Sequence, residues 1–162
     1  SSYTLITTTF LHVDIGHILS NMLFLLFAGS FMENRIGRKK FLFFYLLTGI
    51  CASLFYFAFN RSSAVPAVGA SGAISGLLGA ILVLSFYYPK QTWNKYYFLG
   101  LGTKSFSVLW LLIYICLQVF FATIETSPNI AYSAHIGGFI AGFILIFFFK
   151  NKKEIYEGEE IS

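Results

Sequence analysis

Five long runs of apolar residues, separated by short polar stretches, constrain this chain more than any other feature. The runs are about Ile15–Gly37, Phe41–Phe59, Ala70–Tyr88, Phe106–Ile124 and Ala131–Phe149. Each is long enough to cross a hydrocarbon core of ~30 Å as a helix. Backbone groups in lipid must bond within their own segment, and connections this short favour helices over a barrel. We therefore predict an all-α, polytopic transmembrane bundle of five helices.

The small number of charged residues supports the same fold class. Charged residues make up 11% of the chain and hydrophobic residues 57%, whereas a soluble domain carries about 25% charged residues. So few charges cannot cover the surface of a soluble domain, so the lipid bilayer is the expected surrounding. The basic residues lie at the ends of the apolar runs, as membrane anchors do, and form no single patch. No nucleic-acid partner is therefore expected.

The basic residues also predict an orientation. Of the 11 lysines and arginines, all but Arg61 lie in or beside the connections on one side of the predicted membrane. The positive-inside rule then places the N-terminus outside and the C-terminus in the cytoplasm. We expect residues 1–150 to form the membrane core and residues 151–162 to form a polar cytoplasmic tail. Because no eukaryotic targeting segment is visible, a prokaryotic plasma membrane is expected.

Polar side chains gather near the outer ends of the three runs that enter from the outer face. Such groups are costly inside a membrane span, so each calls for an explanation. They are His12, His17 and Asn21 in or just before the first run, Ser71 in the third and His135 in the fifth. At a rise of 1.5 Å per residue, Ser71 and His135 are expected at similar depth.

Small residues predict that the third and fifth runs touch. The relevant glycines are Gly72 and Gly76 in the third run and Gly138 and Gly142 in the fifth. Stripes of this spacing let two membrane helices approach closely, which would bring Ser71 and His135 together. A serine hydroxyl becomes a good nucleophile when a base takes its proton, and His135 is placed to act as that base. No Asp or Glu lies at this depth, so a Ser–His dyad is predicted rather than a triad.

Acyl transfer also requires hydrogen-bond donors for the developing oxyanion. Asn21 offers a side-chain amide, His17 an imidazole N–H, and Ser71 its backbone N–H. Gly69 and Gly72 would let the backbone around Ser71 bend and approach a substrate closely. The residues alone thus predict a serine nucleophile, a histidine base and three candidate oxyanion donors.

Taken in order, these motifs resemble the rhomboid intramembrane serine proteases. The matching stretches are Thr7–His12 with His17 and Asn21, Glu33–Gly37, Gly69–Gly72, and Ala134–Gly138 with Gly142. The resemblance covers roughly Tyr3 to Lys150 and implies a serine endopeptidase that cleaves transmembrane helices of other membrane proteins near the outer face. It implies no cofactor and no metal.

The resemblance also implies a role for each site residue. Ser71 would be the nucleophile and His135 the general base. His17, Asn21 and the Ser71 backbone would form the oxyanion hole, and His12 would hold the preceding loop in place by hydrogen bonds.

Three departures from the family pattern stand out. The family usually has six core helices, and the first has no counterpart here, so we expect the chain to be a fragment or a trimmed form. The Trp-Arg pair common in the family's first loop is replaced by Tyr3 and Thr4. The aromatic residue that often follows the nucleophile by four positions, and packs on the histidine, is replaced by Ser75.

Two other functions are compatible with parts of the sequence. A non-catalytic relative would bind transmembrane helices without cutting them; the presence of both Ser71 and His135 argues against it, and the departures at Thr4 and Ser75 keep it open. A channel or transporter would need polar residues through the full depth of the bundle, whereas here they concentrate at the outer end. Both cysteines lie mid-span with no histidine at the same depth, so a cysteine nucleophile is not expected.

Overall fold

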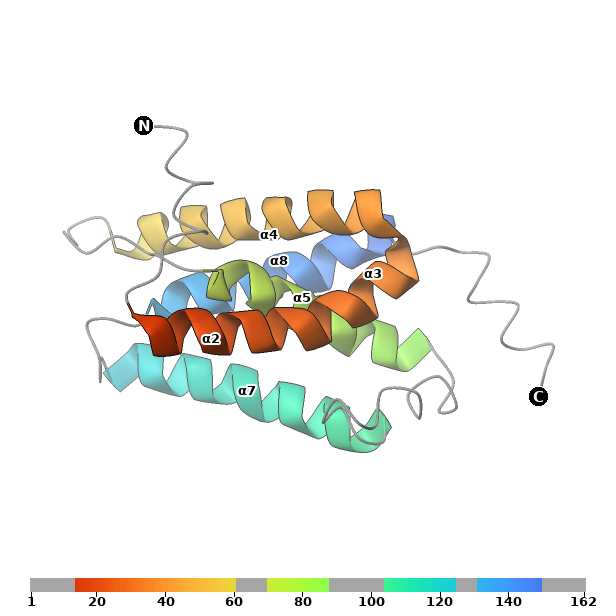
Figure 1. Cartoon of the computed structure of the whole chain (residues 1–162). Coiled ribbons are helices and arrows are strands. Elements are labelled where there is room, and N and C mark those ends of the chain that lie inside the picture. The colour runs from red at the N-terminus through yellow and green to blue at the C-terminus, as the bar shows by residue number, and fades with distance from the viewer. Residues whose placement is uncertain (1–13, 61–69, 88–103, 125–130, 150–162) are drawn as a thin grey trace.

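The computed structural model describes residues 14–60, 70–87, 104–124 and 131–149, and within these ranges all the regular structure is helical. Its elements are α2 (Ile15–Phe24), η2 (Leu25–Gly29), α3 (Ser30–Ile36), α4 (Arg38–Phe59), α5 (Ser71–Tyr87), α7 (Lys104–Ile124) and α8 (Tyr132–Phe149) (Figure 1). The predicted all-α bundle is confirmed. Each of the five apolar runs forms a helix whose bounds lie within a few residues of those predicted.

Three of the helices are long and apolar enough to cross a membrane. They are Ile15–Ile36, Arg38–Phe59 and Tyr132–Phe149, and Ser71–Tyr87 and Val108–Ile124 are apolar but shorter. With 17 residues, α5 rises only about 25 Å. Its short length is compatible with a membrane because the other helices surround it, and every residue from Gly72 to Ser85 is buried.

The elements α2, η2 and α3 form one continuous helix with a π-helical segment at Leu25–Gly29. It begins at Asp14, whose side chain accepts a hydrogen bond of 2.7 Å from the backbone N–H of His17 and so caps the first turn. It ends at Gly37, whose φ of +82° suits glycine and few other residues, and α4 starts at the next residue. The chain changes direction at Gly37, and α3 and α4 contact each other beside this turn.

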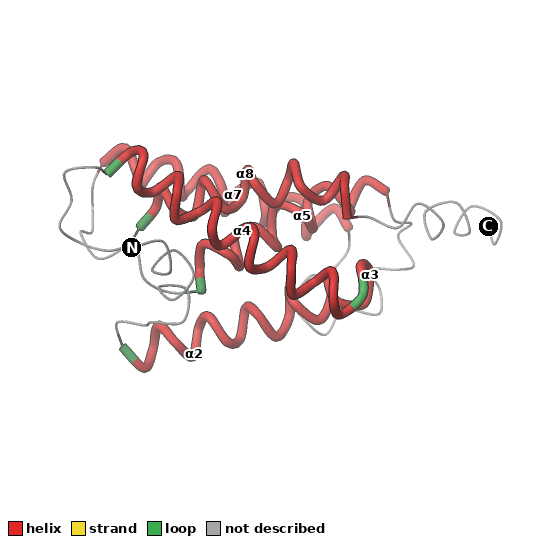
Figure 2. The backbone as a smooth tube through the Cα atoms, turned by 90° about the horizontal axis from the view of Figure 1, so that it is seen from above, coloured by secondary structure: helices red, strands yellow, loops and turns green. Residues whose placement is uncertain are grey.

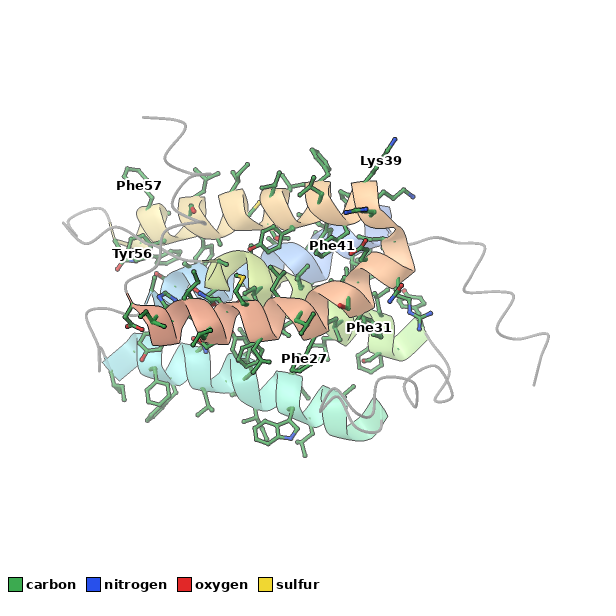
Figure 3. All side chains as sticks on the ribbon, in the orientation of Figure 1. Phe27, Phe31, Lys39, Phe41, Tyr56 and Phe57 are labelled. Carbon is green, nitrogen blue, oxygen red and sulfur yellow. The ribbon has the colours of Figure 1, made fainter. Side chains whose placement is uncertain are left out.

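The nucleophile candidate lies on the most enclosed helix. α5 packs against α4, α7, α8 and η2, and Figures 1 and 2 both show it inside the bundle. The outer helices instead expose large apolar side chains, such as Phe57 at 63% and Phe148 at 80%. In Figure 3, Phe57 and Lys39 point away from the bundle near opposite ends of α4. Large apolar side chains exposed on the outside of the bundle are expected where the surrounding solvent is lipid.

Glycines allow three helices to pack closely. A Cβ atom on Gly138 would overlap the carbonyl oxygen of Gly72, and one on Gly142 would overlap the carbonyl oxygen of Gly76. Gly72 and Gly76 themselves make room for α4, because a Cβ on Gly76 would lie 2.5 Å from the Cβ of Thr48. The α8 glycines thus admit the α5 backbone, while the α5 glycines admit α4 side chains.

Replacing Gly142 with alanine is therefore expected to destabilise the fold by about 1–3 kcal/mol, the usual cost of overpacking a tight core. The overlap is with backbone, which cannot swing aside as a side-chain tip can. Thermal unfolding in detergent measures the effect. Gly16→Ala is the matched control, since Gly16 is exposed in the first turn of α2 and alanine is a better helix former than glycine. Equal stability of the two variants would contradict the prediction.

Candidate active site

Ser71 is the first residue of α5, and small residues surround it on both sides. Ala70 precedes it, and the Ala70 carbonyl accepts the backbone N–H of Ile74 at 2.9 Å, which closes the first turn. Gly72 follows and lies against Ala52 of α4. Because the first N–H groups of a helix have no acceptor within the helix, the backbone N–H of Ser71 is available to an outside group.

His135 lies in the first turn of α8 and meets Ser71 directly. The Ala131 carbonyl accepts the backbone N–H of His135 at 3.2 Å, so the helix start fixes its position. Its Nε2 lies 2.8 Å from Ser71 Oγ, although the two residues are 64 positions apart in the sequence. The contact joins the starts of α5 and α8, which run side by side through the glycine packing described above. The structure thus brings the predicted serine and histidine together.

The other ring nitrogen of His135 has a partner that sequence reasoning missed. His135 Nδ1 lies 2.8 Å from the side-chain oxygen Oε1 of Gln118, on α7. Asp and Glu are the usual residues that orient a catalytic histidine, but a side-chain amide oxygen is also a hydrogen-bond acceptor. A signal was present, since Gln118 is the only amide or charged side chain between Val108 and Ala122. Such a residue in a span calls for an explanation.

The aromatic contact to the histidine comes from its own helix. The ring of Tyr132 meets the imidazole of His135 edge to face, with centroids 6.4 Å apart and an interplanar angle of 87°. Ser75, at the position where the resemblance implies an aromatic residue, is fully buried, and its hydroxyl lies 2.5 Å from Tyr114 Oη of α7. The departure at Ser75 therefore comes with a different set of neighbours for the imidazole.

Two of the predicted oxyanion donors lie on α2, which packs against α5. Asn21 is only 5% exposed, and its amide nitrogen Nδ2 is buried with no hydrogen-bond partner among the described residues. His17 is half-buried in the first turn of α2. A buried amide donor without an acceptor is costly and is suited to an incoming oxygen. His12, Gly69 and Thr4 lie outside the described residues.

The family model of the Rhomboid domain matches residues 1–152. The chain belongs to the rhomboid family. The resemblance seen in the sequence motifs is thereby confirmed, and this rhomboid chain is an integral membrane protein with several membrane-crossing helices.

Individual rhomboid relatives agree with the family match. The chain is 38% identical over 141 residues to "Rhomboid protease GluP" of Bacillus subtilis, which covers 87% of this chain. It is 35% identical over 147 residues to "RHOMBOID-like protein 1" of Arabidopsis thaliana, which covers 91% of it. "Inactive RHOMBOID-like protein 8" of the same plant is 32% identical over 139 residues, or 86% of this chain. The family thus includes both proteases and an inactive member.

This rhomboid chain spans only part of these relatives, namely 25% of the length of the Bacillus protein and 34% and 36% of the two plant proteins. The relatives come from a bacterium and a plant, so the expected prokaryotic membrane stays a prediction. The same holds for the orientation of the chain in that membrane.

Proposed function

We propose that this rhomboid chain is an intramembrane serine endopeptidase that hydrolyses peptide bonds in or near transmembrane helices of other membrane proteins. The observation that carries the proposal is the 2.8 Å contact between Ser71 Oγ and His135 Nε2. At this distance an imidazole can accept the proton of a serine hydroxyl and so act as its general base. Membership of a family that includes a named protease adds to the case.

The proposed mechanism follows the contacts atom by atom. Ser71 Oγ attacks the substrate carbonyl carbon while His135 Nε2 takes the hydroxyl proton. The oxyanion is held by the Ser71 backbone N–H, the Asn21 amide and His17. His135 then gives its proton to the leaving amine, which leaves an ester between the substrate acyl group and Ser71. Water attacks this ester with His135 again acting as base, and releases the carboxylic acid and the free serine.

The position of the site in the bundle suggests where a substrate would be cut. Ser71 and His135 lie in the first turns of α5 and α8, at the end of the bundle where α2 begins and α4 and α7 end (Figure 1). The exposed basic residues Arg38, Lys39 and Lys40 lie at the other end. Under the positive-inside rule the site faces the outer side, close to water and to the ends of neighbouring transmembrane helices.

A second candidate is a rhomboid-like protein that binds transmembrane helices without cutting them. The observation that favours it is the 32% identity to a relative named as inactive. This candidate predicts an unreactive Ser71, which separates it from the protease in a single experiment.

That experiment is labelling with a fluorescent fluorophosphonate, which reacts with activated serines. The complete protein, in detergent or liposomes, is expected to label, and Ser71→Ala is expected to lose the label entirely because no nucleophile remains. Ser85→Ala is the matched control, since Ser85 lies on the same helix and its hydroxyl bonds only locally to the Leu82 carbonyl at 2.6 Å. A folded wild type that fails to label, or a Ser71→Ala variant that labels equally, rules out the protease and favours the helix-binding protein.

A further inference from the structure

Resting on the proposed function, we propose that Gln118 is a positioning residue that fixes the tautomer and orientation of His135. The contact that points to this role is the 2.8 Å distance between Gln118 Oε1 and His135 Nδ1. Gln118 belongs to α7, whereas the histidine belongs to α8 and the serine to α5. Three helices thus supply a chain of contacts from Gln118 through His135 to Ser71.

A neutral imidazole carries its single proton on one of its two ring nitrogens, and the groups around it decide which one. An amide oxygen only accepts hydrogen bonds, so a ring nitrogen facing it at 2.8 Å must donate. The proton is then on Nδ1, and Nε2 presents its lone pair to the Ser71 hydroxyl, which is the arrangement a general base requires. In the other tautomer Nδ1 and Oε1 would be two acceptors facing each other, while Nε2 would point its proton at the serine. Gln118 therefore favours the competent tautomer.

An amide suits this place better than a carboxylate in one respect. A charge removed from water is costly unless it is paired, and a hydrogen-bonded neutral amide costs far less. The amide holds the ring from one side while Tyr132 packs its ring against the imidazole. Among the described residues, Gln118 contacts the imidazole of His135, and it is His135 that contacts Ser71, so the influence of Gln118 on the reaction passes through His135.

Helix docking is the competing explanation for the same contact. α7 makes a second polar contact one helical turn earlier, between Tyr114 and Ser75 of α5, and either contact could serve only to hold α7 in place. The two explanations differ in what they predict for the imidazole. Positioning predicts a tautomer that depends on Gln118 and not on Tyr114, whereas docking predicts that loss of either contact acts alike.

Three variants of the complete protein separate these explanations. Gln118→Met keeps a side chain of similar length and removes the acceptor, and fluorophosphonate labelling is expected to slow roughly tenfold, which corresponds to the loss of a hydrogen bond worth about 1.4 kcal/mol. Gln118→Glu keeps an acceptor oxygen and is expected to label within a few-fold of the wild type. Tyr114→Phe keeps the ring, removes only the hydroxyl bonded to Ser75, and is expected to label within about twofold.

The tautomer is read directly by ¹⁵N NMR of histidine-labelled protein, at a pH where the imidazole is neutral. The chain has three histidines, and the signals missing from His135→Ala identify those of His135. The wild type, Gln118→Glu and Tyr114→Phe are expected to show a protonated Nδ1 and an unprotonated Nε2. Gln118→Met is expected to show the two tautomers mixed, which a purely structural role would not produce.

The outcomes also keep the two proposals apart. If the wild type does not label, the proposed function fails and the positioning role falls with it. If the wild type labels and Ser71→Ala does not, the proposed function stands. The positioning role is then overturned if the tautomer of His135 is unchanged in Gln118→Met, whether or not labelling of that variant slows. A wild type with the proton on Nε2 also overturns it, because Gln118 would then donate its amide nitrogen to Nδ1 and hold the histidine in the wrong form.

Discussion

Replacing His135 with alanine is expected to lower the rate of peptide-bond hydrolysis by about 10³-fold or more. The variant keeps the Ser71 hydroxyl and loses the only base within hydrogen-bond distance of it among the described residues. General-base assistance alone contributes about 10²–10⁴-fold, and removing one member of a serine–histidine pair typically costs more than that. Hydrolysis of fluorescently labelled casein by the complete protein in detergent measures the change.

A loss of structure has to be separated from this loss of base. The thermal unfolding midpoint of His135→Ala is expected to fall by only a few degrees, because the contacts of the imidazole with Ser71 and Gln118 are lost while the backbone contacts of the first turn of α8 remain. Retention of more than a tenth of the wild-type rate by a folded His135→Ala variant would contradict the assignment of His135 as the base.

Replacing Asn21 with alanine is expected to lower kcat by about 10²–10³-fold and to change KM little. This is the usual cost of removing one oxyanion donor, because the bond forms with the transition state and not with the bound substrate. The structural basis is the buried Nδ2 of Asn21, which has no partner among the described residues and is available for an oxyanion.

Asn34→Ala provides the matched control for this variant. Asn34 belongs to the same continuous helix but is exposed near its far end, where its amide bonds to the Ser30 carbonyl at 2.8 Å. Its replacement is expected to leave kcat within about twofold, as surface substitutions away from a site usually do. A rise in KM with unchanged kcat in Asn21→Ala would mean that Asn21 binds the substrate rather than the oxyanion.

The positions of the helices were predictable from the sequence because the length and spacing of apolar runs largely determine where a membrane protein forms helices. In lipid, a single long apolar segment satisfies its backbone hydrogen bonds by forming a helix. The bounds of α4, α5, α7 and α8 therefore follow closely from where the apolar runs begin and end. The proximity of Ser71 and His135 was predictable for a related reason. Depth in a membrane is set by the number of residues past the helix start, and the glycine stripes indicated which helices approach each other.

The remaining features depend on rotation of the helices about their axes, which hydropathy does not specify. Gln118 is conspicuous as the only amide in its apolar run, but hydropathy does not show which neighbouring helix the Tyr114 and Gln118 side of α7 faces, so its contact with His135 was not predicted. Likewise, the sequence pattern showed small residues in α5 but not that Gly72 and Gly76 face α4. The π-helical segment at Leu25–Gly29 was not predicted from the sequence.

The order of the site residues along the chain has a consequence for biosynthesis. Ser71 is on α5, Gln118 on α7 and His135 on α8, so the ribosome makes the proposed nucleophile first and its proposed base last. A nascent chain with only the earlier helices inserted carries a serine that nothing activates. In the proposed protease, hydrolytic capacity would arise only when α8 docks against α5, through glycines that leave no room for a side chain. Under that proposal, an incompletely inserted chain would be unable to cut neighbouring nascent chains.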